Sequence, residues 1–399
     1  MNREELEGLF SEFGTPLYVF DIRELSGRVQ KIREILGDRI HLCYSIKANP
    51  FLVPAMLPLV DRLEVCSPGE LSICEDRKVP GEKILYSGVN KMPNDIKDAV
   101  SYGAGICTAE SVHQFTLVHE EAVRQGKVLP VLLRINVGSQ FGMSKEDLLY
   151  LIDHRSEYPN LVIEGIHCFG GTQRKNLKIQ RGELSMLRDL FEEIRTEHHF
   201  DIRRLEYGTG LPVPCFEGDD FDHPFRLLSD LAPDLQAAAD FADVTVEMGR
   251  FFAASCGWYL TKVTDIKQVK DACYALVDGG IHHVHYDGQM MGMKVPKIVH
   301  LKEDSTSKAS DPETHSWTIC GSLCTTSDVL VRKVDLDGLS LGDVLCFANV
   351  GAYSVTEAMD LFLSRTMPRV VLYDGRQGEL ARDFVESWKL NTQGDSQQM

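Results

Sequence analysis

Residues 41–50 read HLCYSIKANP, a short β-prone run that ends near Lys47 and gives way to a proline-led helix start. The same strand-then-helix unit repeats along the chain to Arg250. Helix-like segments separate the runs, and in the segment 185–199 apolar residues recur at helical spacing. The other strand-like runs are 62–67, 83–89, 104–109, 130–137, 162–169, 202–208 and 244–250.

Eight such units in about 210 residues are the size and rhythm of a (β/α)₈ barrel, as in the TIM-like enzymes. The alternative is an open, doubly wound sheet. That fold places a glycine-rich fingerprint after its first strand, and the sequence KANPFLV at 47–53 is not one. We therefore predict a TIM-like barrel over residues 23–255.

After residue 256 the pattern changes to short strands separated by turn signals. We predict a C-terminal β domain, a β-sandwich or small β-barrel, formed by 256–390 together with 1–22. The run TPLYVFD at 15–21 reads as a lone strand that joins it, and a late helix is expected near Glu379. The polar tail 391–399 is predicted to be disordered.

Composition limits the possible partners. The net charge of -17 argues against nucleic acid and anionic membranes, which need a basic footprint. No apolar run reaches the ~18 residues of a spanning helix, and the N-terminus has no signal-peptide core. Eleven cysteines without a CxxC pair indicate a reduced, cytoplasmic protein. Cys320 and Cys324 lack a second pair that would complete a zinc site, so we expect no metal.

Polar and glycine residues gather where the predicted strands end, the face on which barrel enzymes carry their active sites. A single lysine is usually a solvated charge, a Gly-rich turn is common, and a Glu–Arg pair can be a plain ion pair. Together, however, they supply what a pyridoxal phosphate site needs: an amine, anion donors, a flat side chain and a partner for the ring nitrogen. The residues are Lys47, His167, Phe169, Thr172, Gly208, Thr209, Gly210, Glu247 and Arg250.

These motifs resemble those of the fold-type III pyridoxal-phosphate decarboxylases, the family of ornithine, arginine and diaminopimelate decarboxylases. YSIKAN is similar to Y-x-x-K-A-N, which implies that Lys47 forms the Schiff base. EYGTGLP is similar to the phosphate loop D-x-G-G-G-F-P, which implies backbone donors at 208–210. EMGR is similar to E-P-G-R, which implies Glu247 at the ring nitrogen and Arg250 near the phosphate. Glu64 stands where the family has an acid near the cofactor.

The resemblance continues through the second domain. GSLCTTSD is similar to G-x-x-C-x-x-x-D, which implies Cys324 as the proton donor and Asp328 as a substrate or interface residue. NVGAYS is similar to the G-A-Y motif, which implies that Tyr353 reaches the phosphate. In the family the partner subunit supplies these residues, so a homodimer with shared active sites is implied.

Three motifs depart from the family pattern. Phe169 and Thr172 replace the histidine and serine of H-x-G-S, and His167 lies two residues before the usual stacking histidine. Gln140 replaces the lysine of K-F-G, so the expected lysine–aspartate pair becomes at best a Gln140–Asp328 hydrogen bond. Thr325 replaces the acid that often follows the catalytic cysteine. The pattern is most similar to a secondary-metabolism branch that includes a decarboxylase of carrier-protein-bound glutamate.

The predicted chemistry is α-decarboxylation. Glu247 keeps the ring nitrogen charged, which favours electron withdrawal, and Cys324 then protonates the carbanion. A racemase of similar architecture is the main alternative, but it would place an arginine at the nitrogen. A regulator that only binds the cofactor is a second alternative; such proteins tend to lose the lysine or the cysteine.

The substrate stays open at this stage. Thr325 and Thr326 offer no charged anchor for a second amine, so a glutamate-like acid, a carrier-bound amino acyl group or a modified diamino acid all fit. His282, His283 and His285 suggest metal at first sight, but no carboxylate or cysteine completes a site. We expect these histidines to line the substrate entrance; if their segment is a strand, His283 and His285 share a face.

Overall fold

A computed structural model describes residues 1–302 and 314–392. The chain divides into two compact units. The first, called the barrel unit here, comprises Ser26–Pro212 and His223–Phe252. The second, the β unit, comprises Met1–Leu25, Val213–Asp222 and Ala253–Met399. Residues 213–222 therefore cluster with the β unit although they lie between two barrel elements in sequence.

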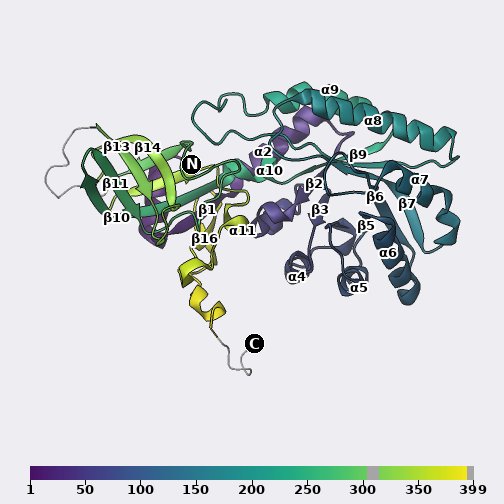
Figure 1. Ribbon diagram of the computed structural model, residues 1–399, viewed down its shortest axis with the longest axis horizontal. Helices are drawn as coiled ribbons and strands as arrows, with labels where there is room; N and C mark the ends of the chain where they lie inside the picture. The colour runs from purple at the N-terminus through teal and green to yellow at the C-terminus, as the bar shows by residue number, and fades with distance from the viewer. Residues whose placement is uncertain (303–313, 393–399) are drawn as a thin grey trace. The chain divides into compact units, whose positions relative to one another are not determined.

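Eight parallel strands close the barrel in chain order, which confirms the predicted fold class (Figure 1). Each strand is short and almost wholly buried, as expected where one face lines the barrel interior and the other meets helices. The strands are β2 (His41–Ser45), β3 (Arg62–Val65), β4 (Ile84–Tyr86), β5 (Ile106–Ala109), β6 (Leu129–Arg134), β7 (Leu161–Phe169), β8 (Arg204–Gly208) and β9 (Asp243–Met248).

Helices follow the strands and begin at recognisable caps. Ser67, Ser111 and Ser144 each accept a backbone N–H at a helix start, and Gly103 and Gly126 end two helices in the left-handed conformation that glycine tolerates. The helices are α2 (Ile22–Leu36), α3 (Val53–Met56), α4 (Pro68–Asp76), α5 (Pro93–Tyr102), α6 (Val112–Gln125), α7 (Lys145–Asp153), α8 (Leu177–Thr196), α9 (Arg226–Ala238) and α10 (Arg250–Ala253). Short 3₁₀ turns are η1 (Ile46–Ala48), η2 (Pro50–Leu52), η3 (Gly81–Lys83), η4 (Arg155–Glu157) and η5 (Ala254–Cys256).

The β unit contains a nine-stranded mixed sheet. Its main path runs β14-β13-β11-β10-β1-β16-β17, and β15 pairs with both β10 and β12. The strands are β1 (Leu17–Asp21), β10 (Gly257–Val269), β11 (Ala272–Val277), β12 (Ile298–Leu301), β13 (Thr314–Cys320), β14 (Val329–Asp337), β15 (Val344–Ala348), β16 (Arg369–Tyr373) and β17 (Gly378–Arg382). The predicted strand at 15–21 is confirmed as β1, which lies between β10 and β16.

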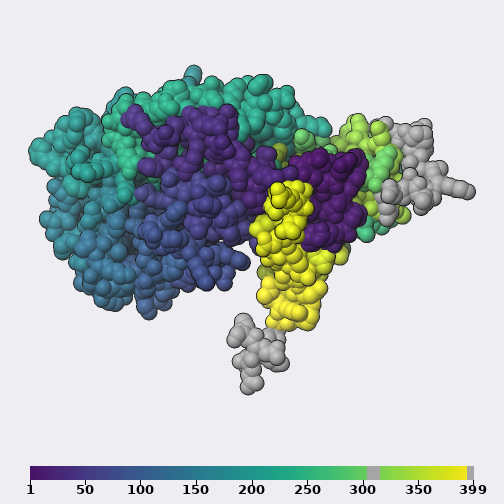
Figure 2. All heavy atoms as spheres, turned by 180° about the vertical axis from the view of Figure 1, so that it is seen from behind, coloured from purple at the N-terminus to yellow at the C-terminus, as the bar shows by residue number. Residues whose placement is uncertain are grey.

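Both ends of the chain contribute to the β unit. Helix α1 (Arg3–Phe13), which we did not predict, begins with a capping box between Asn2 and Glu5. Its buried Leu6 and Leu9 join the core of the sheet. Figure 2 shows these first residues, in dark purple, beside the C-terminal segment in yellow, where Arg369 donates to the carbonyl of Phe13 at 2.5 Å. The remaining short elements are α11 (Ser354–Glu357), η6 (Phe362–Ser364) and η7 (Ser387–Leu390).

One secondary-structure prediction is wrong, and one condition of the sequence analysis is not met. The helix expected near Glu379 is strand β17, which pairs antiparallel with β16. Residues 281–283 form a hydrogen-bonded turn, with the N–H of His283 donating to Gly280 O at 3.0 Å, and not a strand. Of the tail predicted to be disordered, residues 393–399 lie outside the described part. Within residues 1–302 and 314–392, no helix has the length and apolar character needed to cross a membrane.

Candidate active site

Lys47 lies in η1, directly after the C-terminal end of β2. Its side-chain nitrogen is 2.5 Å from Glu64 Oε2 and 3.3 Å from the sulfur of Cys66. Glu64 belongs to β3, and Cys66 follows that strand by one residue. The thiol of Cys66 also donates to Glu64 Oε1 at 2.9 Å. Two neighbouring strand ends thus bring an amine, a carboxylate and a thiol together at the barrel mouth.

The electrostatics of this group depend on Lys47. Burial alone would raise the pKa of Glu64, but the Lys47 ammonium and hydrogen bonds from Cys66, Lys47 and Ser45 lower it to about 2. Burial and the Glu64 charge raise the pKa of the Cys66 thiol well above its usual range. Glu64 is therefore a carboxylate at neutral pH, while Cys66 is a protonated thiol that acts as a hydrogen-bond donor.

A second carboxylate lies on β9, the strand that pairs with the other side of β2. Glu247 Oε2 accepts a hydrogen bond from His167 Nε2 at 2.9 Å, and both side chains are buried. Glu247 Oε1 accepts from the hydroxyl of Ser45 at 3.3 Å. A buried carboxylate held by two donors is suited to face a protonated ring nitrogen. The structure thus places His167 on Glu247, a contact that the sequence did not predict.

The predicted phosphate loop follows β8 and is tightly packed. A Cβ added to Gly208 would lie 2.3 Å from the ring of Phe169, and one added to Gly210 would lie 1.9 Å from the carbonyl oxygen of Gly171. Gly210 also has φ +59°, which favours glycine. The two glycines let the Phe169 ring and the Gly171 carbonyl pack directly against the loop. A glycine-rich turn of this kind can offer backbone N–H groups to a phosphate, with an aromatic ring beside it.

The remaining barrel residues differ in how they lie. Arg250 is largely buried and begins α10, directly after the strand that carries Glu247. Thr209 is fully buried within the phosphate loop. Thr172, by contrast, is exposed on the turn after β7. The arginine and the loop are thus held by the barrel, whereas Thr172 is a surface residue of the turn.

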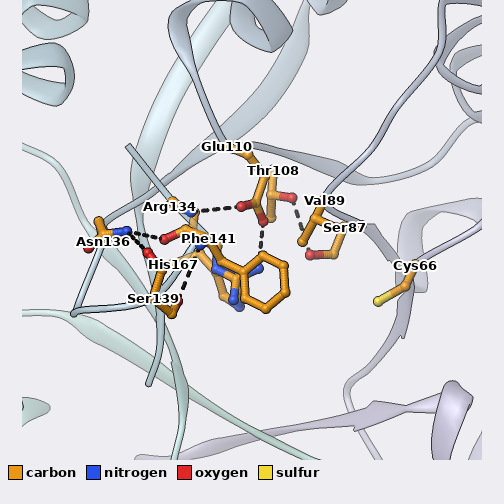
Figure 3. Close-up of polar contacts among 12 residues, drawn as sticks. Cys66, Ser87, Val89, Thr108, Glu110, Arg134, Asn136, Ser139, Phe141 and His167 are labelled. Atoms are coloured by element: carbon orange, nitrogen blue, oxygen red, sulfur yellow. Dashed lines mark hydrogen bonds and ion pairs between the residues drawn. The ribbon is translucent and has the colours of Figure 1, made fainter. Parts of the chain in front are cut away.

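A further ion pair at the strand ends was missed by the sequence analysis. Arg134, the last residue of β6, contacts Glu110 Oε1 at 2.5 Å, and both side chains are buried. The other oxygen of Glu110 accepts the N–H of Gly142 at 2.8 Å, and the Phe141 ring lies 5.1 Å from the Arg134 guanidinium carbon. Figure 3 shows this group beside His167. The pair holds the loop that contains the Q-F-G sequence, residues 140–142, over the barrel mouth.

The β unit carries the predicted cysteine loop, residues 321–328, between β13 and β14. Cys324 is exposed there as a free thiol. Asp328 is buried, and its carboxylate accepts the N–H of Leu323 at 2.7 Å and of Ile281 at 2.9 Å. Thr325 Oγ1 lies 2.9 Å from Ser327 Oγ. Asp328 thus organises the loop from within its own chain, and the hydrogen bond with Gln140 stays a prediction.

Tyr353 also lies in the β unit and has the left-handed backbone φ of 69°. Such a conformation costs a side-chain-bearing residue of order 1–3 kcal/mol and is concentrated at functional sites. The next residue, Ser354, is fully buried, and its hydroxyl donates to the carbonyl of His285 at 2.7 Å. The strained backbone is therefore tied to the turn that follows β11.

The histidine cluster is packed into the β unit. His282 and His283 are buried with ring centroids 3.8 Å apart, and His283 Nδ1 contacts the Tyr259 hydroxyl at 2.9 Å. Burial and the nearby Arg365 lower the pKa of His282 to about 4. His285 is partly exposed and lies 3.2 Å from Glu357. Two of the three histidines are therefore neutral core residues, and the proposal that the cluster lines the substrate entrance rests on His285.

Comparison with known proteins identifies the family. Residues 17–351 match the family described as Pyridoxal-dependent decarboxylase, C-terminal sheet domain. The chain belongs to this family. It is 29% identical over 427 residues to the L-glutamyl-[BtrI acyl-carrier protein] decarboxylase of Niallia circulans, covering 99% of this chain and 98% of the relative. It is 26% identical to the 2-[(L-alanin-3-ylcarbamoyl)methyl]-2-hydroxybutanedioate decarboxylase of Staphylococcus aureus, covering 89% of this chain and 93% of the relative.

Among solved structures, the decarboxylase is similar to diaminopimelate decarboxylase from Methanocaldococcus jannaschii in complex with L-lysine. The TM-score is 0.83 at 26% identity, and the match covers 96% of this chain and 92% of the other. The protein is therefore a pyridoxal-phosphate-dependent decarboxylase of an amino acid or an amino-acid derivative. These relatives give no support to the racemase or regulator alternatives.

The residues of the barrel fit this cofactor. Lys47 supplies an amine at the barrel mouth, and the glycine-rich turn 208–210 has no side chain at 208 or 210, where Phe169 and Gly171 pack closely. Sequence reasoning missed Ser45 and Cys66, which contact the two carboxylates. Each lies two residues from a predicted site residue on its strand or strand end, so the two-residue period of a strand could have found both.

Proposed function

We propose that Lys47 attaches pyridoxal 5'-phosphate in the barrel and that the site removes the α-carboxyl group of an amino-acid derivative. Two carboxylates converge on the barrel mouth, each with its own positive or hydrogen-bonding partner: Glu64 with Lys47, and Glu247 with His167. This paired arrangement is the observation that carries the proposal. A site with one bare carboxylate could not hold both an amine and a ring nitrogen in charged form.

Each residue has a stated task. The bound cofactor supplies the electron sink for the bond that breaks. Glu247, oriented by His167, holds a proton at the ring nitrogen, and Glu64 balances the charge of Lys47 whenever that nitrogen is free. The Phe169 ring packs against Gly208 of the phosphate loop 208–210, and Arg250 is assigned to the phosphate. Glu64 and Glu247 are thus assigned to the two ends of the cofactor.

Product formation needs a proton at the α carbon, which carried the carboxyl group before CO₂ left. We assign this step to the Cys324 thiol, which is exposed and carried on a loop that Asp328 fixes through two backbone N–H groups. Tyr353 is assigned to the phosphate. Cys324 and Tyr353 belong to the β unit, and we propose that a homodimer completes each site with these residues from the partner subunit.

The substrate is proposed to be an amino acid whose distal group is not an ammonium. Asp328 is the carboxylate of the cysteine loop, and it is turned inward onto backbone N–H groups, so it is not available to a substrate amine. Thr325 and Thr326 follow Cys324 where a distal group would meet the loop. The two relatives named above act on a carrier-bound glutamyl group and on a carboxylate-rich amino acid. A carrier-bound or acidic amino-acid derivative is therefore the preferred substrate class.

We also propose that the protein is located in the cytoplasm. All eleven cysteines are free thiols. Disulfides are rare where glutathione keeps thiols reduced, so this usage supports the cytoplasm. A secreted protein of this size with eleven unpaired cysteines would be open to oxidation.

Absorbance spectra of the purified protein with pyridoxal phosphate test the proposal, with wild type beside Lys47→Ala. We expect a long-wavelength band in the wild type and none in the variant. Release of CO₂ is then followed with glutamate, diaminopimelate, lysine, ornithine and a glutamyl thioester of a carrier protein. CO₂ from glutamate or the thioester supports the substrate class, whereas CO₂ from lysine or diaminopimelate overturns it. A band without CO₂, but with loss of optical activity, would replace the decarboxylase by a racemase.

A further inference from the structure

The hydroxyl of Ser45 lies between the two carboxylates of the site. Ser45 is the last residue of β2, and its register partner on β3 is Glu64. Cys43, two residues earlier, is in register with Glu247 on β9. Side chains alternate along a strand, so Ser45, Glu64 and Glu247 all face the barrel interior. Ser45 is 3% exposed, which leaves little room for water to replace its hydroxyl.

The hydroxyl has one acid as its hydrogen-bond partner and the other as its neighbour. Ser45 Oγ donates to Glu247 Oε1 at 3.3 Å. Glu64 is its register partner on β3, and the Ser45 side chain contributes to the lowered pKa of Glu64. Ser45 precedes η1, yet its side chain makes no capping bond to that turn. The hydroxyl is therefore not needed by the local backbone, and the groups around it are the two carboxylates. Two pairs, Lys47 with Glu64 and His167 with Glu247, lie on either side of Ser45, which donates to Glu247.

A serine hydroxyl has a single proton, and an ionised carboxylate can only accept. The hydroxyl therefore donates to Glu64 or to Glu247, but not to both at once. Which acid receives the proton depends on what else each acid holds. While Lys47 is a free ammonium, it satisfies Glu64, and the Ser45 proton is available to Glu247. When the Lys47 nitrogen is covalently occupied, Glu64 loses its ammonium and competes for the Ser45 proton.

We propose that Ser45 is a positioning residue that couples the state of Lys47 to the strength with which Glu247 holds a proton. With Lys47 occupied, Glu247 keeps only His167 as a donor and becomes the stronger proton acceptor. With Lys47 released, Glu247 regains the Ser45 donor and becomes the weaker one. This switching rests on the proposed function, whereas the coupling itself is a property of the chain without cofactor. The coupling requires a hydroxyl group on residue 45. It does not require the fold to change.

The experiment is a double-mutant cycle on the cofactor-free protein. Trinitrobenzenesulfonate labels uncharged amines, and mass spectrometry of the peptide that contains Lys47 gives its labelling rate as a function of pH. The proteins are wild type, Glu247→Gln, Ser45→Ala, the double variant, and Ser45→Thr alone and with Glu247→Gln. Removing the Glu247 charge frees the Ser45 proton for Glu64, which weakens the hold of Glu64 on Lys47 and speeds labelling.

We expect Glu247→Gln to raise the labelling rate at pH 7 about tenfold when residue 45 is serine or threonine. In the Ser45→Ala background, Glu247→Gln can act on Lys47 only through the long-range field of the lost charge. We expect the labelling rate there to rise about threefold or less. Equal increases in the serine and alanine backgrounds would overturn the proposal. If Ser45→Ala does not fold, Ser45→Cys keeps the size with a weak donor and should give the small increase.

An absorbance titration of the wild-type protein with pyridoxal phosphate separates this inference from the proposed function. If no cofactor band forms, the proposed function fails, while the labelling cycle still decides the coupling. If the band forms but the cycle shows no dependence on residue 45, the coupling alone is lost. Ser45→Thr is the rescue variant, because it keeps the hydroxyl group that Ser45→Ala removes. If residue 45 only filled space, its hydroxyl group would make no difference to the labelling rate.

Discussion

Lys47 Nζ and Glu64 Oε2 lie 2.5 Å apart at the ends of neighbouring barrel strands, with Glu64 buried and Lys47 partly exposed. The amine can therefore meet a ligand from one side while its charge is balanced from the other. The low pKa of Glu64 shows how strongly the folded state favours the carboxylate. This pair makes the acid stability of the cofactor-free protein depend on Glu64.

Glu64→Gln is expected to flatten the pH dependence of stability at low pH. The pKa of Glu64 is about 2 in the folded state, against 4.5 for an ordinary glutamate. A lowered folded-state pKa stabilises the fold above 4.5, and this contribution is lost as pH falls from 4.5 towards 2. We expect the variant to lose on the order of 2 kcal/mol of unfolding free energy at pH 7. Urea unfolding at pH 7 and pH 4 measures both effects.

The control for this change is Glu75→Gln, because Glu75 is exposed on α4. It should leave the pH dependence of the unfolding free energy unaltered. If Glu64→Gln and Glu75→Gln lost the same unfolding free energy, the contact between Lys47 and Glu64 would add nothing specific to stability.

Phe169→Ala is expected to weaken cofactor binding about tenfold, because an aromatic contact contributes ~0.5–1.5 kcal/mol beyond buried area. The ring rests on Gly208, where no Cβ could fit beside it. Phe169→His, which restores the family residue, should bind within about threefold of wild type, since it keeps a flat ring. Absorbance titration with pyridoxal phosphate gives the dissociation constants. Equal affinity of the alanine variant and wild type would remove Phe169 from the cofactor site.

The barrel could be predicted from sequence because its signals are local. The strands are mostly buried runs, and several helices begin at a capping side chain followed by an apolar stripe. The late helix near Glu379 was predicted for the same reason and is wrong. Residues 378–382, GELAR, contain good helix formers, but pairing with β16 places them in the sheet. Pairing with a strand so near in sequence was not visible from composition.

The site was only partly predictable. The motifs named Lys47, Glu64 and Glu247, but the contacts between side chains from different strands depend on register. Ser45 could have been found, because it lies two residues before Lys47, at the end of β2. The Arg134–Glu110 pair had no such signal, because its members are 24 residues apart on separate strand ends. Long-range geometry thus decides which polar residues become partners.

The β unit should lose stability in mild acid because of His282. Its pKa is lowered to about 4 by burial first and then by Arg365, against 6.5 for an ordinary histidine. Between pH 6.5 and pH 4, His282 is therefore protonated in the unfolded chain and neutral in the folded chain. This contribution to stability is complete above 6.5 and falls as the pH drops from 6.5 towards 4. We expect a loss of about 2 kcal/mol between pH 7 and pH 5.

His282→Asn should reduce this loss, while His113→Gln, at an exposed position on α6, should not. Urea unfolding at pH 7 and pH 5, followed by tryptophan fluorescence, compares the three proteins. The same acid sensitivity in wild type and His282→Asn would contradict the assignment of the effect to this ring.

Asp328→Asn is expected to disturb the cysteine loop without affecting the barrel. The carboxylate accepts two backbone N–H groups, from Leu323 and Ile281, whereas an amide offers one acceptor oxygen and turns an NH₂ towards the second donor. A buried N–H left without an acceptor costs about 1–3 kcal/mol. We expect the loop to loosen, Cys324 to react several-fold faster with a thiol reagent, and kcat to fall at least about tenfold. Affinity for pyridoxal phosphate should stay within about twofold of wild type, because Lys47 and the phosphate loop lie in the barrel unit.

Thr326→Ala, on the exposed side of the same loop, is the matched control and should leave the thiol reactivity unchanged. A fall in kcat without any change in Cys324 reactivity would instead place Asp328 in contact with the substrate.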